Sequence, residues 1–382
     1  AAMIVEAADR PARLLTLDDA ETREAATADP RGFLALEPEG LLVIDEFQRV
    51  PGLALALKAV VDSDRTSGRF LLTGSVTMPA ARPAGDSLAG RVVGTRVFGF
   101  SQGERAGRRD DFVRAVLRGA LEAQYRSGMG RADYVDLLTA GSMPEACRLP
   151  QRYRADWLES YVSRLLGRDL REFSRLSDPR RLRSLLAGLA AAQGSETVVA
   201  RLGGAVNLSA STTTSYMELL RALHLVERLP PWTPNLLKRE VGRSKYLLTD
   251  SALAMRLTRT SPDTLKDLVR GGALGGLLEA FVAAELMRQS TWCEERFTIS
   301  HYRSPDGREI DLILELDDGR VIAVEVKAAS SASAADARHL RWLEGRIGDR
   351  LVAGVVFTTD DRSRHLGGRL WAVPVAALWE LG

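Results

Sequence analysis

The stretch that decides the fold lies at residues 308–327 and reads REIDLILELDDGRVIAVEVK. Two apolar runs, 310–314 and 321–326, predict β-strands because they are short and rich in β-branched residues. Asp317-Asp318-Gly319 between them predicts a tight turn. The segment therefore predicts a β-hairpin in the C-terminal third of the chain.

Charged side chains interrupt both predicted strands. Asp311 lies in the first strand and Glu325 in the second, and Lys327 shares a face with Glu325 because strand side chains alternate. The two carboxylates would supply hard oxygen ligands for Mg²⁺, and Lys327 would orient or polarise an attacking water. Glu279, in the helical run 276–282, would add a further acid. This set indicates a metal-dependent nuclease centre; the alternative is a solvated hairpin face that binds nothing.

Lysine is rare in this chain. Of 52 basic residues, only five are lysines: Lys58, Lys238, Lys245, Lys266 and Lys327. Where arginine is used almost everywhere else, a lysine on the second strand favours chemistry that needs a compact ammonium group.

Length and composition are those of an ordinary protein with two or three domains. The 382 residues are 45% hydrophobic and 27% charged, and the net charge of +2 gives no general case for nucleic-acid binding, so a DNA-binding surface would be local. Cys147 and Cys293 lack metal-ligand spacing and indicate no disulfide framework. No apolar run approaches the roughly 18 residues of a membrane span. We expect a cytoplasmic protein with no membrane partner.

The N-terminal part carries a pattern typical of nucleotide-binding sheets. The run 41–46 is apolar and ends in Asp45 and Glu46, and the run 69–75 repeats the design with a polar end that includes Thr73 and Ser75. Asp45 would hold Mg²⁺ through water, Glu46 would activate the hydrolytic water, and Thr73 or Ser75 would sense the γ-phosphate of ATP. The alternative is that the two acids merely begin the next turn.

The loop that cradles phosphates in such proteins has no counterpart here. The sequence contains no Gly-x-x-x-x-Gly-Lys-Ser/Thr and no Gly-Lys dipeptide. Residues 1–8 have helical character, and a parallel sheet needs its central strand, so we expect the missing strand and loop to precede residue 1. The alternative is true loss of nucleotide binding. In either case the polypeptide is predicted to be a poor ATPase.

A basic stripe marks the helical middle of the chain. Its four arginines recur at intervals of four, three and four residues, at Arg164, Arg168, Arg171 and Arg175. The stripe indicates either a phosphate-facing helix, including arginines offered to a neighbouring subunit's nucleotide, or a solvated face with local ion pairs.

Three predicted helices and a strand between residues 181 and 232 have the spacing of a winged helix. The third helix is predicted from Thr212 to Leu225, with Ser209 near its N-cap, and the wing at 226–232. In DNA-binding versions the start of the third helix reaches base edges. Here that position offers only the hydroxyls of Ser211, Thr212, Thr213 and Ser215. A structural or protein-binding winged helix is therefore equally open.

The order of these pieces closely resembles a prokaryotic family of AAA-type P-loop ATPases. In that family a C-terminal domain of unknown function has a PD-(D/E)xK, restriction-endonuclease-like fold. The segments that carry the resemblance are VIDEFQRVP at 43–51, FLLTGS at 70–75, SLAGR at 87–91, GSMPE at 141–145, RDL at 168–170, LPPW at 229–232 and YLLTD at 246–250.

The resemblance implies roles for particular residues. Asp45 and Glu46 become the Walker B pair, and Arg91 becomes a candidate for sensing nucleotide across a subunit boundary, with a purely structural arginine as the alternative. The PD-(D/E)xK positions fall on Glu279, Asp311, Glu325 and Lys327. The missing Walker A loop is the departure from the family pattern and puts ATP binding by this polypeptide in doubt.

We therefore predict an α/β multidomain protein. Its parts are a partial P-loop ATPase domain at 1–105, a helical connector at 106–175, a winged-helix-like segment at 176–245 and a restriction-endonuclease-like domain at 246–382. Expected cofactors are ATP, bound weakly or not at all, and Mg²⁺; expected partners are DNA, a second copy of the chain or another protein. Three functions stay open: ATP-controlled, Mg²⁺-dependent DNA cleavage; a regulatory or binding switch with an inert nuclease-like domain; and a pseudo-ATPase scaffold, if residue 1 is the true start.

Overall fold

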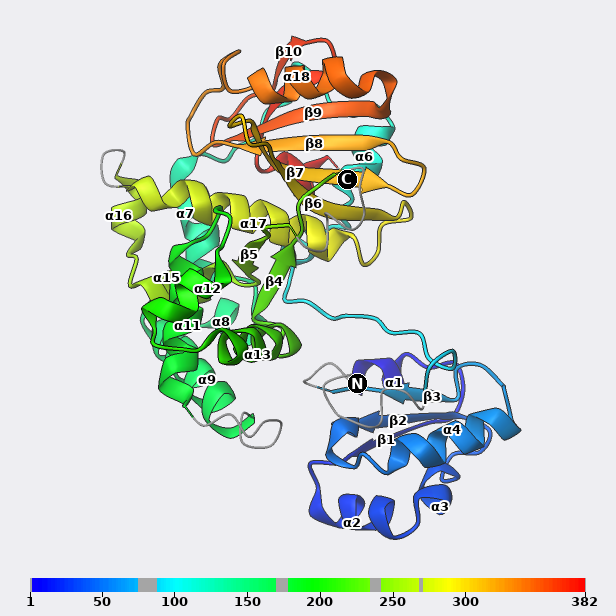
Figure 1. The fold of residues 1–382 in the computed structure, drawn as a ribbon. Helices are drawn as coiled ribbons and strands as arrows, with labels where there is room; N and C mark the ends of the chain where they lie inside the picture. The colour runs from blue at the N-terminus through cyan, green and yellow to red at the C-terminus, as the bar shows by residue number, and fades with distance from the viewer. Residues whose placement is uncertain (1, 75–87, 170–177, 234–241, 268–270, 382) are drawn as a thin grey trace. The chain divides into compact units, whose positions relative to one another are not determined.

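The structure is a computed structural model that describes residues 2–74, 88–169, 178–233, 242–267 and 271–381 (Figure 1). These residues divide into two compact units, one of residues 1–95 with 222–224 and one of residues 96–221 with 225–382. The architecture is mixed α/β, with a parallel sheet in the first unit and a mixed sheet in the second. Ser75, Arg171 and Arg175, three residues with predicted roles, lie outside the described residues. The predicted boundaries at 105, 175 and 245 stay predictions.

The first unit is a three-stranded parallel sheet with helices. The strands follow the order β1-β2-β3, with Leu42 opposite Arg13 in β1 and Phe70 in β3. The elements are α1 (Ala2–Glu6), β1 (Ala12–Thr16), α2 (Ala20–Ala28), α3 (Pro30–Leu34), β2 (Leu41–Asp45), the 3₁₀ helix η1 (Phe47–Arg49), α4 (Leu53–Ser63) and β3 (Phe70–Leu72).

The burial of β2 agrees with its position as the middle strand of the sheet. Its four apolar residues, 41–44, are all buried, as expected for a strand that is covered on both faces. Leu53 and Leu57 of α4 belong to the same core cluster. The predicted strands at 41–46 and 69–75, the helix between them and the opening helix are confirmed. The sequence pattern did not predict β1.

The second unit begins with a helical part. Its elements are α5 (Gln102–Arg105), α6 (Phe112–Leu117), α7 (Arg131–Ala140), α8 (Pro144–Arg148), α9 (Gln151–Arg164), the π-helix η4 (Leu165–Asp169), α11 (Pro179–Ala191), α12 (Val199–Ala205), α13 (Ala210–Ala222), β4 (Val226–Leu229), β5 (Lys245–Leu248), α15 (Ser251–Thr258), α16 (Pro262–Lys266) and η5 (Gly271–Ala273). None of the helices in the described residues is long and apolar enough to cross a membrane.

The helices and strand predicted between 181 and 232 are present as α11, α12, α13 and β4, and β4 pairs with β5 in an antiparallel ribbon. Ser209 caps α13, with its hydroxyl accepting from the Thr212 amide at 3.2 Å. Thr213 is 1% exposed, and its hydroxyl donates to the Ser209 carbonyl at 2.8 Å. Thr213 is therefore a packing residue between α12 and α13 and does not present its hydroxyl at the surface.

The C-terminal part is a six-stranded mixed sheet in the order β10-β11-β9-β8-β7-β6. Helix α18 covers one face, where its Leu340 and Leu343 pack on Ile313 and Val356 (Figure 1). The elements are α17 (Leu274–Gln289), β6 (Phe297–Arg303), β7 (Glu309–Leu316), β8 (Val321–Val326), α18 (Arg338–Ile347), the 3₁₀ helix η6 (Gly348–Arg350), β9 (Leu351–Thr358), β10 (Arg364–Gly367), β11 (Leu370–Pro374) and α19 (Ala377–Glu380).

The decisive hairpin is confirmed as β7 and β8, which run antiparallel. Gly319 in the turn has φ +83°, a left-handed conformation that favours glycine. All six residues of β8 are buried, because β7 and β9 flank this strand inside the sheet. The alternative of a solvated hairpin face is therefore wrong.

Candidate functional site

Asp311 and Glu325 come together because of the register of β7 and β8. Leu312 lies opposite Val324, so the next positions along both strands place Asp311 beside Glu325. Asp311 is 8% exposed and Glu325 is 3% exposed. One carboxylate oxygen of Asp311 accepts from the Val326 amide at 2.8 Å. The hairpin thus holds two carboxylates at the end of buried strands, as the sequence predicted.

Lys327 completes the predicted set. Its ammonium donates to Glu325 Oε2 at 2.7 Å, and its side chain is 35% exposed. The other oxygen, Glu325 Oε1, is buried and has no hydrogen-bond partner in the part of the chain that the structure describes, and His339 Nδ1 of α18 lies 3.9 Å from it. One buried carboxylate oxygen is therefore left without a hydrogen bond, beside a lysine that reaches solvent.

A second lysine enters the site from β5. Lys245 is 2% exposed, and its Nζ lies 2.8 Å from Glu279 Oε1, 3.0 Å from Glu309 Oε1 and 3.8 Å from Asp311 Oδ1. We call Glu279, Glu309, Asp311 and Glu325 the acid cluster. Glu279 of α17 thus joins the three hairpin acids through Lys245.

Burial and crowding of like charges shift the pKa values in the acid cluster. Burial raises the pKa of Glu279 to about 8, and the Asp311 carboxylate adds to the rise. Burial likewise raises the pKa of Glu325 to about 8, with Asp311 again the next cause. Burial opposes the charge of Lys245, but the carboxylates of Glu279 and Asp311 outweigh it and raise its pKa. Four carboxylates therefore share a buried space, and burial together with their mutual repulsion favours the neutral forms of Glu279 and Glu325 near pH 7.

The arrangement fits a sparse magnesium site. No group of three or more His, Cys, Asp or Glu side chains within the described ranges is arranged to hold a metal ion. Mg²⁺ at phosphoryl-transfer sites, however, is commonly held by one or two carboxylates, water and substrate phosphates. The pair of Asp311 and Glu325, with the unpartnered Glu325 Oε1, suits that mode.

The predicted Walker B residues lie at the carboxyl end of the first sheet. Asp45 ends β2, and its carboxylate accepts hydrogen bonds from the hydroxyls of Thr73, beyond β3, and Thr16 of β1. Glu46 follows in a left-handed conformation with φ 56°, and its Oε2 accepts from the Gln48 side chain at 2.6 Å. Asp45 and Thr73 therefore meet at this edge of the sheet, and their roles in nucleotide binding stay predictions.

Nothing among the described residues offers a phosphate cradle beside Asp45, in keeping with the absence of a Walker A sequence. Arg91 forms a two-pronged ion pair with Asp62 of α4, with both N–O distances at 2.8 Å. This contact gives Arg91 a structural role; its predicted sensing role stays a prediction.

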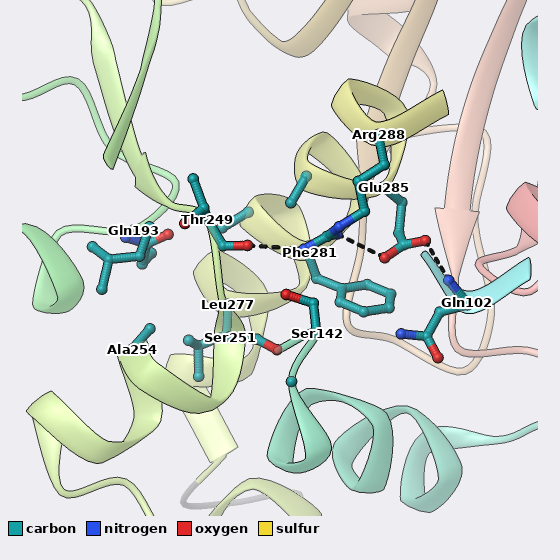
Figure 2. A pocket seen from close by; sticks show the side chains of 14 residues that line it. Gln102, Ser142, Gln193, Thr249, Ser251, Ala254, Leu277, Phe281, Glu285 and Arg288 are labelled. Carbon is teal, nitrogen blue, oxygen red and sulfur yellow. Dashed lines mark hydrogen bonds and ion pairs between the residues drawn. The ribbon is translucent and has the colours of Figure 1, made fainter. Parts of the chain in front are cut away.

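A small pocket in the second unit is a weaker candidate (Figure 2). It is lined by residues that include Ser142, Phe281, Glu285 and Arg288, and its volume of about 10 Å³ holds about one water. The Glu285 carboxylate is fully buried, where it accepts from the Gln102 amide at 2.9 Å and pairs with Arg288 at 2.8 Å. The pocket is too small for an organic ligand, and the charges of Glu285 and Arg288 pair with each other.

Sequence reasoning missed three residues of this site: Glu309, Lys245 and His339. Lys245 carried a usable signal, since it is one of five lysines in an arginine-rich chain and begins the strand YLL at 246–248. His339 carried none, because only packing of α18 brings it beside Glu309, whose carbonyl lies 2.6 Å from His339 Nδ1.

Comparison with known protein families gives three consecutive matches. An AAA domain model matches residues 2–106, and two domains of unknown function, DUF8612 and DUF4143, match residues 131–264 and 274–378. The AAA-domain and DUF4143 matches support an AAA-type ATPase family. Lys245 lies in the DUF8612 match and the four acids of the acid cluster lie in the DUF4143 match, so the ion pairs of Lys245 join the two matched segments.

Two curated relatives are uncharacterized proteins of Mycobacterium bovis and Mycobacterium tuberculosis. Each is 30% identical to this chain over 318 residues, which are 82% of this chain and 65% of the relative. The chain thus spans about two thirds of their length. A crystal structure of a Vibrio cholerae protein aligns over 97% of this chain and 95% of its own, but at 13% identity and a TM-score of 0.21 it carries no argument.

Proposed function

We propose that the second unit is a nuclease-like module that hydrolyses DNA phosphodiester bonds with Mg²⁺ held by Asp311 and Glu325. The single observation that carries the proposal is the pairing of these two carboxylates with a free buried oxygen, Glu325 Oε1, beside the solvent-reaching Lys327. This is the set that the resemblance to PD-(D/E)xK proteins implies.

Four side chains would have separate roles in the proposed hydrolysis. Asp311 and Glu325 would hold the cation, and the Val326 amide fixes the Asp311 carboxylate. Lys327, held by Glu325 at 2.7 Å, would orient the attacking water and balance the negative charge of the phosphate. Glu279 would not hold the cation itself but would act on the site through its ion pair with Lys245. When bound, Mg²⁺ would polarise the phosphate and lower the pKa of a coordinated water.

We infer that an AAA-type ATPase domain controls this module. The Walker B-like contact of Asp45 with Thr73 and the AAA-domain match support that part of the proposal. The segment of α11, α12, α13, β4 and β5, which the sequence pattern predicts to be a winged helix, would then connect the two activities or bind a partner. DNA, a second copy of the chain and another protein are the partners that fit these parts.

A second function has its own supporting observation. Lys245 already compensates Glu279 and Glu309 at 2.8 and 3.0 Å, so the acid cluster is stable without a metal ion. On this reading the nuclease-like fold is inert and serves as a regulatory or binding switch.

The test is a calorimetric titration of Mg²⁺ and Mn²⁺ with cleavage assays on plasmid and single-stranded DNA in the same buffers. Asp311→Asn keeps an acceptor for the Val326 amide but loses the charge, so we expect it to lose both metal binding and cleavage. Lys327→Met is expected to bind metal and to cleave at least about 100-fold more slowly, while Lys266→Met, a change at a surface lysine, leaves both unchanged. Cleavage that survives in Asp311→Asn and Lys327→Met, or no cleavage by the wild type, contradicts the nuclease and favours the switch.

A further inference from the structure

Lys245 is a buried cation supplied to the acid cluster by a separate element. It begins β5, which pairs with β4 outside the six-stranded sheet, whereas Glu309 and Asp311 lie on β7 and Glu279 on α17. Its neighbour Ser244 is tied to the loop after α11, since its carbonyl accepts from the Thr197 amide at 3.0 Å. The ribbon of β4 and β5 therefore fixes where the ammonium lies.

The Lys245 ammonium lies among several carboxylates but is closer to some of them than to others. It makes hydrogen-bond-length contacts with Glu279 and Glu309, and its distance of 3.8 Å from Asp311 Oδ1 is beyond a hydrogen bond. Among the described residues Glu325 Oε1 has no hydrogen-bond donor, and Lys245 approaches Asp311 Oδ1 only to 3.8 Å, so neither of these oxygens accepts a hydrogen bond from Lys245. A divalent ion at these oxygens would lie within a few ångströms of the ammonium, and burial leaves the repulsion poorly screened.

We propose that Lys245 is a tethered internal cation that competes with a divalent ion for the acid cluster, an inference that rests on the proposed metal site. Without metal, Lys245 neutralises the acids; with metal, it withdraws toward Glu279 and Glu309 or leaves them. Lys245 thereby sets the cation affinity of the site. If Lys245 competes with the ion, removing its charge strengthens metal binding. If it were only a structural ion pair, its removal would loosen the acids and weaken metal binding.

The competition also couples metal binding to the ribbon of β4 and β5. If a bound ion disfavours the position of Lys245, then by linkage any partner that draws β5 away from the acid cluster favours metal binding to the same extent. The ribbon lies directly after α13, so a ligand of that segment would control the site through one side chain.

The test uses Mn²⁺ as the probe, with free Mn²⁺ measured by electron paramagnetic resonance on the full chain. Lys245→Gln keeps donors for the acids but removes the charge, and we expect it to bind Mn²⁺ about tenfold or more tightly than the wild type. Lys266→Gln is the matched control, because Lys266 pairs with Asp136 at the surface, and it should bind as the wild type does. Adding Asp311→Asn to Lys245→Gln should abolish the gain.

The outcomes separate the two proposals. Equal or weaker binding by Lys245→Gln, with Asp311-dependent binding in the wild type, overturns the competition and leaves the metal site standing. Absence of Asp311-dependent binding in both proteins overturns the metal site and the competition together.

A second measurement needs no change at Lys245. Saturating Mn²⁺ should raise amide hydrogen exchange in β4 and β5 of the wild type but not of Asp311→Asn. Unchanged or slower exchange in that ribbon, while Mn²⁺ binds through Asp311, contradicts the competition.

Discussion

Single residues in the second unit show how burial decides the charge state of a side chain. His301 of β6 is fully buried, and its Nε2 contacts the Arg243 carbonyl at 3.1 Å. Burial lowers the pKa of His301 to about 4, and the charge of Lys245 contributes to the fall. The folded protein therefore keeps this imidazole neutral at a pH where the unfolded chain binds a proton.

This difference predicts an acid-sensitive contribution to stability. Because the pKa of His301 is lowered in the folded protein, its contribution to the free energy of unfolding is fully present above pH 6.5, the ordinary histidine value. This contribution is lost as the pH falls toward 4. Between pH 7.5 and 4.5 the loss amounts to about 2.5 kcal/mol in the free energy of unfolding. Urea unfolding at both pH values should show a change that is about 2.5 kcal/mol more destabilising in the wild type and in His365→Gln, an exposed-histidine control, than in His301→Gln. An equal loss in all three proteins would rule out His301 as the cause.

Residue patterns identified much of the site but not its internal cation. Alternation along 308–327 correctly placed Asp311 and Glu325 together, because cross-strand pairing is a local rule that the sequence carries. The contact of Lys245 with Glu279 spans 34 positions and depends on how α17 packs against β5. No periodic pattern encodes such a contact, so only lysine rarity pointed to it.

At the scale of elements, substitutions at two adjacent glycines of α12, Gly203 and Gly204, test how closely this helix packs on α13. A Cβ atom on Gly203 would lie 2.0 Å from the hydroxyl oxygen of the buried Thr213, whereas a Cβ on Gly204 would meet nothing within 4 Å. Thr213 is branched and hydrogen-bonded to Ser209, so it has little freedom to move away.

Gly203→Ala is therefore expected to lower the free energy of unfolding by about 1–3 kcal/mol through overpacking. Gly204→Ala, one residue away in the same helix, should be neutral or raise it by up to about 1 kcal/mol, since alanine favours helices. Chemical unfolding followed by circular dichroism measures both. Similar changes in the two variants would mean that α12 and α13 are not packed as described.

Elements were predicted best where local chemistry specifies them. The hairpin of β7 and β8, the helix α4 and the cap of α13 follow from alternation, apolar periodicity and a serine hydroxyl. Strand β1, ARLLT at 12–16, was missed because five residues with two charged or polar members give no clear alternation. It is a strand because β2 offers it a parallel edge.

At the scale of the whole molecule, net charge and fold say little about partners. A charge of +2 over 382 residues excludes a generally basic surface, so DNA recognition would depend on the neighbourhood of Lys327. The three family matches follow one another along the chain, and the curated relatives are longer than it. Control of the nuclease-like module by ATP is therefore a proposal.

The central claim is that Asp311 and Glu325 form a divalent-cation site inside the acid cluster. The most direct measurement is anomalous X-ray diffraction from crystals soaked in Mn²⁺. The account predicts one peak within coordination distance of Asp311 Oδ1 and Glu325 Oε1, with Lys245 displaced from Asp311. Crystals that show no peak there, with Lys245 still between Glu279 and Asp311, would contradict it and identify the acid cluster as an ion-pair network closed by lysine.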